Sequence, residues 1–339
     1  MTSPLVSIIV LNFNGKHFLD ENLSSLMNQT YTPLEVILVD NASEDGSIEY
    51  VQEHFPKVRI VVNGKNTGFP ANNLGIQAST GDYIMLLNND TVVDSHMVEE
   101  SVKELVKDNQ IGMGAVKILS MGQANILDSI GINIYPDGMS RQRGRLEEDI
   151  GQYDRVEELL IPSGCAAFYK KEMLNEVGLL DEDFFAYCED TDLGFRGRLA
   201  GWKTISIPSA RVYHHYSGSF NKVSPFKAFL VERNHLWFAI KCFPLTMLLA
   251  LPFYTFYRFA VQIYALLTGQ GMGGKFVEEQ SSLALIAILV RAYCSAFAKL
   301  PTMLKKRKTI QRSRKVTTRE IKAWFKKYRI TAKDLTMTG

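Results

Sequence analysis

An α/β fold built on a mostly parallel, doubly wound sheet is predicted for the first 120 residues of this 339-residue chain. Short β-rich apolar runs alternate there with segments whose apolar residues recur at helical spacing. Alternating units of this length place helices on both faces of a parallel sheet. The expected strands are 6–11, 35–39, 58–62, 83–87 and 114–118, and the expected helices are 18–27, 47–54, 70–78 and 96–108.

Polar residues collect where three of these strands end. The first strand runs into 12–15 (NFNG), the second into 40–43 (DNAS) and the fourth into 88–90 (NND). Asn, Asp and Gly are also ordinary turn formers, so a single loop of this kind indicates little. Ligands of doubly wound sheets bind at the carboxyl ends of the strands. Three polar loops at one edge therefore predict a binding site there.

The middle of the chain changes character twice. Residues 131–160 are polar and charged and are expected to form a mobile flap outside the core. Order resumes with an apolar run at 161–169 and a helix at 171–177, and the densest set of functional residues follows at 181–220.

The charge is distributed unevenly. The formal net charge is +2, but residues 299–329 hold thirteen Lys and Arg against one Glu, which leaves about −10 for residues 1–298. The four cysteines lie far apart with no CxxC pair, which favours a reducing compartment. No basic segment precedes a long apolar core at the N-terminus, so we expect no secretory signal and a catalytic part in the cytosol.

The last third is predicted to associate with a membrane surface. Its apolar stretches, 243–268 and 283–298, are interrupted by charges and fit interfacial helices better than clean spans. A buried helical subdomain is the alternative. After a polybasic run at 305–319, apolar residues at i, i+3, i+4 and i+7 predict a basic amphipathic helix with an aromatic face on anionic lipid. These four residues are Ile321, Trp324, Phe325 and Tyr328. The expected domains are 1–225, 226–300 and 301–339.

A glycine pattern in this region is misleading. Gly269, Gly271 and Gly274 satisfy GxGxxG, but they do not open a βαβ unit and no acidic residue follows at the required distance. We interpret them as a flexible connection. Nucleic acid is not an expected partner, because no nucleic-acid-binding module accompanies the basic tail.

Six collinear segments resemble those of a known family. They read VSIIVLNFNG, SLMNQTYTPLEVILVDNASEDGS, NTGFPANNLGI, GDYIMLLNNDTVV, SGCAAFYKKEMLNEVGLLDEDFFAYCEDTDLGFRGRLAGW and IPSARVYHHYSGS. In order and spacing over residues 4–220, the chain resembles family 2 glycosyltransferases of the GT-A (Rossmann-like) fold, and among them the rhamnosyltransferase-like branch of surface polysaccharide assembly. The resemblance implies an inverting enzyme that takes a sugar from a nucleoside diphosphate.

The resemblance implies a divalent cation, Mg²⁺ or Mn²⁺, that neutralises the leaving diphosphate. Asp90 occupies the last position of the family's Asp-x-Asp-like motif and is the implied metal ligand. Asn88 stands where the family has the first carboxylate, which is a departure that weakens the site. His214 matches the family's metal-binding histidine, and His215 is the alternative one position later.

The nucleotide is expected at the ends of the first strands. By resemblance, Asp40 accepts a hydrogen bond from the imide edge of uracil or thymine, which favours a UDP or dTDP donor. Its alternative role is to form the turn beside Asn41. Further contacts to base, ribose or diphosphate are expected from Leu11, Phe13, Asn66, Gly68, Asn73 and Asn89.

The general base is expected in the CEDTDL segment. Direct displacement at an anomeric carbon needs one group that deprotonates the acceptor hydroxyl. Crowded carboxylates raise at least one pKa, which suits such a base. Matched to the family's Glu-Asp pair, Asp190 is the implied base and Glu189 orients the acceptor or Asp190. Asp192 and Arg196, four residues apart, are expected to pair structurally.

Small residues precede the base and are implied to lie where donor sugar and acceptor meet. They are Ser163, Gly164 and Cys165. Trp202 fits packing better than sugar stacking. The expected partners are the sugar nucleotide, a lipid-linked or growing glycan acceptor, and an anionic membrane at the cytoplasmic face. A homo-oligomer is left open.

Two rival hypotheses remain. A nucleotidyltransferase would use a similar sheet and metal, but no Gly-rich basic phosphate loop follows the first strand. A non-catalytic membrane scaffold with a decayed site is supported only by Asn88. Metal-dependent release of a nucleoside diphosphate would distinguish the enzyme from the scaffold.

Overall fold

The computed structural model describes residues 3–215, 224–268 and 282–336. The chain divides into two compact units. The first comprises Met1–Ile132 and Gln142–Ser217, and the second comprises Asn133–Arg141 and Gly218–Gly339. The C-terminal region, divided at residue 300 in the sequence analysis, thus belongs to one unit. That unit also includes a nine-residue segment from the middle of the chain.

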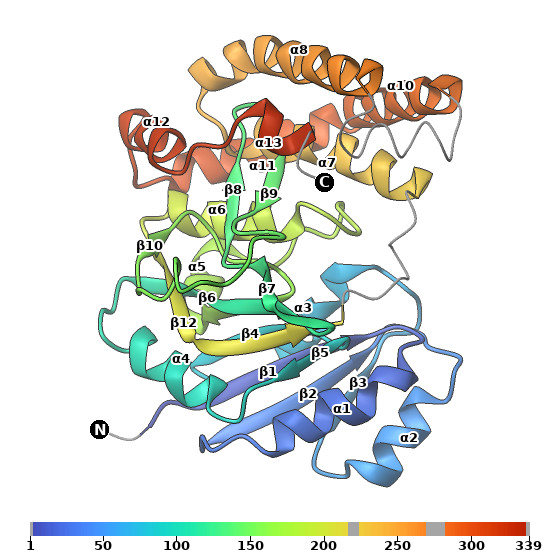
Figure 1. Ribbon diagram of the computed structural model, residues 1–339, viewed down its shortest axis with the longest axis vertical. Helices are drawn as coiled ribbons and strands as arrows, with labels where there is room; N and C mark the ends of the chain where they lie inside the picture. The colour runs from blue at the N-terminus through green and yellow to red at the C-terminus, as the bar shows by residue number, and fades with distance from the viewer. Residues whose placement is uncertain (1–2, 216–223, 269–281, 337–339) are drawn as a thin grey trace. The chain divides into compact units, whose positions relative to one another are not determined.

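The first unit is built on a ten-stranded mixed sheet (Figure 1). Its strands are β1 (Val6–Asn12), β2 (Leu34–Asp40), β3 (Arg59–Val62), β4 (Tyr83–Asn88), β5 (Thr91–Val93), β6 (Ile111–Ser120), β7 (Gln123–Ser129), β10 (Glu158–Leu159), β11 (Ala166–Lys170) and β12 (Lys203–His214). The order is β10-β12-β6-β11-β4-β1-β2-β3, with β5 paired to β12 and β7 to β6. Strands β3, β2, β1 and β4 are parallel, and β11 runs antiparallel between β4 and β6. The predicted α/β class is confirmed.

Helices cover both faces of this sheet. They are α1 (Lys16–Met27), α2 (Ser47–His54), α3 (Asn72–Ala78, preceded by the 3₁₀ turn η1, Phe69–Ala71), α4 (Met97–Leu105), α5 (Lys171–Val177) and α6 (Glu189–Leu199). Side chains of a strand point alternately to its two faces. Accordingly Ile8 packs in the core with Leu23 of α1, whereas Ile9 packs in the opposite core with Ile76 of α3. Burial on both faces explains the continuous apolar runs of the parallel strands.

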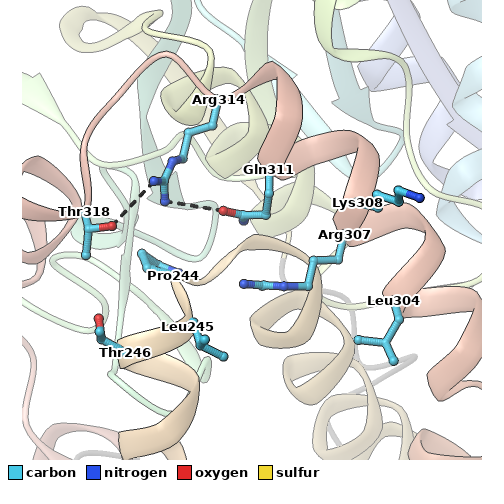
Figure 2. A pocket seen from close by; sticks show the side chains of 9 residues that line it. All are labelled: Pro244, Leu245, Thr246, Leu304, Arg307, Lys308, Gln311, Arg314 and Thr318. Atoms are coloured by element: carbon cyan, nitrogen blue, oxygen red, sulfur yellow. Dashed lines mark hydrogen bonds between the residues drawn. The ribbon is translucent and has the colours of Figure 1, made fainter.

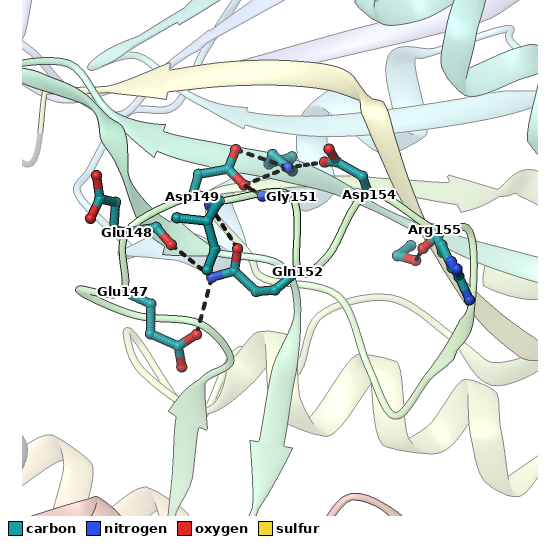
Figure 3. Close-up of polar contacts among 10 residues, drawn as sticks. Glu147, Glu148, Asp149, Gly151, Gln152, Asp154 and Arg155 are labelled. Carbon is teal, nitrogen blue, oxygen red and sulfur yellow. Dashed lines mark hydrogen bonds and ion pairs between the residues drawn. The ribbon is translucent and has the colours of Figure 1, made fainter.

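The expected mobile flap is wrong for much of residues 131–160, which are held by a buried lysine. Lys117 of β6 is fully buried, and its Nζ lies 2.9 Å from Asp149 and 2.5 Å from Asp154. Figure 3 shows the two aspartates of this connection, with the Gln152 amide donating to the Glu148 carbonyl at 2.7 Å. A buried ammonium requires charged partners, so the acidic residues that suggested a solvated loop instead attach it to the sheet.

Lys117→Met is therefore expected to destabilise the first unit by about 1–3 kcal/mol, the cost of leaving buried polar partners unpaired. The side chain of Asp149 is 15% exposed and that of Asp154 is 55% exposed, so water compensates only the second carboxylate well. Urea unfolding measures the loss. Lys103→Met, on the exposed face of α4, is the matched control and should change stability by less than about 0.5 kcal/mol. Equal effects of the two variants would contradict the role of Lys117.

The second unit is mainly helical. It contains α7 (Pro225–Cys242), α8 (Leu245–Leu267), α10 (Ser282–Ala298), α11 (Leu300–Ser313), α12 (Thr318–Lys327) and α13 (Ala332–Thr336), and the hairpin of β8 (Ile132–Ile134) and β9 (Ser140–Gln142) begins and ends at its boundary. Arg258, which interrupts the apolar sequence of α8, is fully buried. Its guanidinium contacts Asp137 at 2.6 Å and Glu232 at 2.8 and 3.0 Å. The arginine therefore serves as the central charge of a buried ionic cluster.

The amphipathic helix of the tail forms as α12, but its orientation differs from the prediction. It begins with a capping box between Thr317 and Glu320. Ile321 is fully buried, and the Phe325 ring packs edge-on against Phe243 at 5.3 Å. This side of α12 thus packs against the unit's own helices, with Ile321 and Tyr328 buried and with Trp324 and Phe325 partly buried, because burying apolar surface stabilises a small helical unit.

Exposed apolar side chains lie on other helices of the second unit. Leu249, Phe253 and Phe256 of α8 are 70–78% exposed, and Leu283 of α10 is 78% exposed. Among the described residues, no individual helix has the length and apolar character required to cross a bilayer; only α10 and α11 together do, and they meet at a bend of 59°. The Gly269, Gly271 and Gly274 connection lies outside the described residues.

Candidate active site

The polar ends of the first, second and fourth strands meet around Asn12. This buried side chain donates to Asp40 Oδ1 at 3.2 Å and to Ser43 Oγ at 3.1 Å. Its own Oδ1 accepts from Asn89 Nδ2 at 2.8 Å. A Cβ on Gly15 would lie 2.1 Å from the Asn89 amide nitrogen, so a larger residue would displace the Asn89 side chain from Asn12. The predicted convergence of the three loops is confirmed.

The predicted nucleotide residues at this edge differ in accessibility. Asp40 is fully buried, and its Oδ2 accepts from the Ser43 backbone N–H at 2.9 Å, which is the turn-forming role considered as the alternative. Its contact with a base stays a prediction. Leu11 is partly buried, whereas Phe13 is 48% exposed and presents a ring to solvent. A flat apolar ring at this edge is suited to pack on a base or ribose.

The NTGFPANN segment is tied to the region that precedes the predicted base. Asn66 Oδ1 accepts from the Gly68 N–H at 2.9 Å. Gly68 has φ +73°, and a Cβ there would lie 2.0 Å from the Phe185 carbonyl oxygen. The Asn73 amide both donates to and accepts from the Leu180 backbone, at 2.9 and 3.0 Å. Both the nitrogen and the oxygen of the Asn73 amide therefore bind the backbone of Leu180, and the predicted contact of Asn73 with a ligand stays untested.

Asp90 and His214 meet at the ends of β4 and β12. His214 Nε2 lies 3.3 Å from Asp90 Oδ1, and its Nδ1 lies 2.8 Å from Asp128 Oδ2. His215, the alternative in the sequence, turns elsewhere and lies 2.9 Å from the Glu21 carboxylate. The structure therefore pairs the side chain of His214, and not that of His215, with the Asp90 carboxylate.

The chemistry of these groups fits a divalent cation. A carboxylate oxygen and an imidazole nitrogen are donors that Mn²⁺ accepts, and a carboxylate behind a ligating histidine is the usual partner that fixes its orientation. Burial alone would lower the pKa of His214, but its interaction with Cys165 and hydrogen bonds to Asp128 and Asp90 raise it. The site thus favours positive charge. A cluster of three or more candidate ligands does not occur in the described part of the chain.

Asp190 lies in the first turn of α6, after a segment of unusual backbone. Phe185, Tyr187 and Cys188 have φ of +66° to +67°, in the left-handed region that non-glycine residues rarely adopt. Asp190 Oδ2 accepts from the Gly164 N–H at 2.9 Å, and its Oδ1 accepts from the Thr191 N–H at 2.6 Å. The carboxylate is held in one orientation by these two backbone donors.

The two acids of this turn differ in environment. Burial raises the pKa of Asp190, and its hydrogen bonds from Gly164 and Thr191 oppose that shift. Glu189 is more buried; burial first, and then the charge of Asp190, raise its pKa well above its usual range. No described group hydrogen-bonds Glu189 Oε2. Environments that separate two neighbouring carboxyl groups assign them different protonation states. The pKa of Glu189 is thus raised further than that of Asp190, so Asp190 is the acid of this pair that loses its proton more readily.

Residues Gly164 and Cys165 connect the two halves of the site. Gly164 bonds to Asp190, as described above, and the next residue, Cys165, interacts with the His214 side chain. His214 in turn contacts Asp90. Ser163 supports this corner, since its Oγ accepts from the Cys165 N–H at 3.4 Å. A series of contacts therefore links Asp190 to Asp90, and their roles as base and metal ligand stay predictions.

Three contributing residues were not identified from the sequence. Asp128 orients His214, Asn12 links the strand ends, and Tyr169 is buried near Asp190; burial first, and then the charge of Asp190, raises the pKa of Tyr169. Asn12 belonged to a polar strand end and could have been singled out. Asp128 and Tyr169 lie in ordinary strand sequence, where no local signal marks a function.

A family model described as "Glycosyl transferase family 2" matches residues 7–178, half of the chain. The chain is 29% identical over 248 residues to N-acetylglucosaminyl-diphospho-decaprenol L-rhamnosyltransferase of Mycobacterium tuberculosis, covering 65% of this chain and 78% of that protein. It is 27% identical over 236 residues to chondroitin synthase of Pasteurella multocida, covering 62% of this chain and 24% of that protein.

Two solved structures share the fold. One is the mannosyltransferase PcManGT from Pyrobaculum calidifontis in complex with GDP-Man and Mn²⁺, with TM-score 0.51, 18% identity and coverage of 92% of this chain and 86% of that one. The other is GalNAc-T7 with UDP, GalNAc and Mn²⁺, with TM-score 0.56, 17% identity and coverage of 70% of this chain and 48% of that one. The family match, the sheet and the joined strand ends agree: this chain is a glycosyltransferase and belongs to glycosyl transferase family 2.

Proposed function

We propose that this enzyme transfers a hexose or deoxyhexose, such as rhamnose, from a UDP or dTDP donor to a lipid-linked or growing glycan, with inversion. The observation that carries the proposal is the continuous series of contacts from Asp190 through Gly164, Cys165 and His214 to Asp90. These contacts support the proposal that a proton acceptor and a cation-binding pair act at one site. The lipid-linked acceptor is supported by the name of the mycobacterial relative.

On the donor side, Asp90 and His214 would hold a divalent cation. When bound, such a cation neutralises the charge that develops on the leaving diphosphate. The chain's own contribution is orientation, because Asp128 fixes the imidazole so that its Nε2 faces Asp90. The exposed ring of Phe13 is available to the base or ribose.

On the acceptor side, Asp190 takes the proton of the attacking hydroxyl. The hydroxyl oxygen forms a bond to the anomeric carbon while the bond from that carbon to the diphosphate breaks, and the nucleoside diphosphate leaves. One displacement inverts the configuration. The backbone N–H groups of Gly164 and Thr191 fix the orientation of the Asp190 carboxylate, so its remaining lone pairs point toward the acceptor hydroxyl. A base held in this way accelerates the reaction.

We further propose that the second unit holds the enzyme at the cytoplasmic face of the cell membrane. The support is an exposed apolar surface on α8 and α10 beside basic sequence in α11 and α12. Apolar side chains together with Lys and Arg suit an anionic bilayer surface. The four cysteines are free thiols, which fits a reducing compartment.

A donor screen tests the function. UDP-, dTDP- and GDP-sugars are compared for thermal stabilisation of the protein with Mn²⁺, Mg²⁺ or EDTA, because a ligand of the folded state raises its apparent stability. We expect one uridine or thymidine donor to stabilise only with metal, and Asp90→Asn to abolish that stabilisation. A GDP-sugar as the best ligand would overturn the donor proposal. Pyrophosphate release from a nucleoside triphosphate would identify a nucleotidyltransferase instead.

Gly164→Ala tests the close approach at the centre of the site. A Cβ there would lie 2.9 Å from both Cβ and Oδ2 of Asp190, so the base must move. We expect kcat/KM to fall about 10²-fold, since small displacements of a catalytic group have effects of that size. Gly122→Ala is the matched control, because its Cβ would meet no atom within 4 Å. Unchanged kcat/KM in Gly164→Ala would show that the contact does not position the base.

A further inference from the structure

The second unit contains a pocket whose charge is entirely positive. Its volume is about 510 Å³, and it lies between the start of α8 and one side of α11 (Figure 2). Arg307, Lys308 and Arg314 are among the nine residues that line it, and none of the nine is acidic. Figure 2 shows Arg307 extending toward Pro244, whereas the ammonium of Lys308 points in the opposite direction. A pocket with three cations and no carboxylate is suited to an anion.

The two arginines are fixed by neutral acceptors. Arg307 Nη1 donates to the carbonyls of Ile240 and Phe243 at 2.8 and 2.6 Å, at the end of α7. Arg314 donates to Gln311 Oε1 at 3.3 Å and, more weakly, to Thr318 Oγ1 at 3.5 Å. These contacts orient the guanidinium groups without neutralising them. Within the described residues, no salt bridge to Arg307, Lys308 or Arg314 is present.

The start of α8 adds backbone donors to the same pocket. Pro244 is the N-cap of this 23-residue helix, and no side chain caps it. The N–H groups of Met247 and Leu248 bond to the Pro244 carbonyl, whereas those of Leu245 and Thr246 have no acceptor among the described backbone and side-chain groups. Free N–H groups and the positive end of a helix dipole bind phosphate well. The helix end and the cations therefore select the same kind of ligand.

Apolar side chains lead away from the pocket. Leu245 lines it and is 64% exposed, and Leu249, Phe253 and Phe256 continue the exposed stripe along α8 at helical spacing. A soluble phosphate would use only the cations. A ligand with a phosphate at one end and hydrocarbon at the other would use both features.

We propose that this pocket binds the phosphate headgroup of an anionic membrane lipid, with the acyl chains along the exposed stripe of α8. The site lies wholly in the second unit, so it is distinct from the donor and acceptor groups of the catalytic unit. Basic pockets between helices at a membrane surface recognise lipid phosphates by the same charge-assisted hydrogen bonds.

The test uses the full-length protein and vesicle sedimentation. Phosphatidylcholine vesicles are prepared with phosphatidic acid, or with phosphatidylglycerol adjusted to the same surface charge. We expect wild-type protein to prefer phosphatidic acid, whose phosphomonoester offers more acceptor oxygens. Lys308→Gln/Arg314→Gln should reduce that preference about tenfold, as loss of charged hydrogen bonds predicts. Lys308→Glu alone, at an exposed position, should reduce it as well.

The control removes the same charge elsewhere. Lys322→Gln/Lys326→Gln, at exposed positions of α12, should weaken binding to both vesicles equally and retain the preference. The proposal is overturned if wild-type protein shows no preference for phosphatidic acid, or if both double variants behave alike. It is also overturned if the protein binds inorganic phosphate through Lys308 and Arg314 but does not sediment with the vesicles. Concentration-dependent dimerisation that depends on Lys308 and Arg314 would also overturn it, in favour of a second copy. Donor binding, measured separately, reports on the catalytic proposal.

Discussion

Asp190→Asn is expected to lower kcat by about 10²- to 10⁴-fold, the contribution of a positioned general base. Asparagine keeps the size of the side chain and can still accept from the Gly164 N–H through its amide oxygen. What it loses is the ability to take a proton from the acceptor hydroxyl. Turnover of the best donor is measured together with donor binding, which should be unchanged.

The pH dependence gives this prediction a second readout. Burial raises the pKa of Asp190 above its ordinary value of 3.8. A base works only when deprotonated, so kcat/KM should fall as the pH drops through the raised pKa and should be constant above it. The acid limb is thus expected at a higher pH than an exposed aspartate would give. In Asp190→Asn the residual activity should lack this limb.

Glu189→Gln is the matched control for Asp190→Asn. Since burial and then the charge of Asp190 raise the pKa of Glu189, the neutral amide resembles the protonated form that this shift favours. We expect activity within about tenfold of wild type, a small loss on the scale of a general base. If Glu189→Gln were as inactive as Asp190→Asn, or if Asp190→Asn retained full turnover, the assignment of the base to Asp190 would be wrong.

Arg258→Met is expected to destabilise the second unit by about 3–5 kcal/mol, because it leaves buried carboxylates without their cation. The side chain of Asp137 is fully buried and that of Glu232 is 10% exposed. Hydrogen exchange of amides in α7 and α8 measures the effect within that unit. Arg291→Met, at an exposed position of α10, should change it by less than about 0.5 kcal/mol.

A triple variant that also neutralises Glu232 and Asp137 distinguishes the effect of unpaired charge from the effect of altered packing in this cluster. In Arg258→Met/Glu232→Gln/Asp137→Asn, uncharged side chains replace all three ions, and much of the lost stability should return, as in other replaced buried ion clusters. Protection of α8 that is equal in Arg258→Met and Arg291→Met would rule out the ionic cluster as a main source of stability.

The sequence predicted elements whose signals are local. The helix at 171–177 and the strand beginning at residue 6 formed at the expected positions because apolar spacing reports which side of an element is buried. The pair of Asp192 and Arg196 also formed, at 2.8 Å, since one helical turn brings them together. Prediction failed where contacts with distant segments decide whether a residue is buried or exposed. From the sequence, Asp149 and Asp154 resembled exposed acids of a loop, whereas the structure pairs both with buried Lys117.

The site was predictable to the extent that position in a strand-end loop implies proximity. Asn12, Asp40 and Asn89 meet because parallel strands end at a common edge. The link from Asp190 to His214 crosses sequence separations that no pattern reports, and it depends on the close approach of Gly164. Asp128 could not be chosen from among the acids of its region, because its importance arises only from contact with His214. The aromatic side of α12 failed for the same reason, since periodicity cannot distinguish a lipid from Phe243.

The segment Asn133–Arg141 leaves one unit, joins the other and returns, so the polypeptide passes between the units three times. A fragment made by stopping near residue 217 would still contain Asp137 without its arginine, and Tyr135 without the edge-on ring of Tyr254. Such a fragment is expected to express poorly for reasons unrelated to catalysis. A minimal soluble catalytic fragment requires a short polar turn grafted in place of these nine residues, in addition to the terminal deletion.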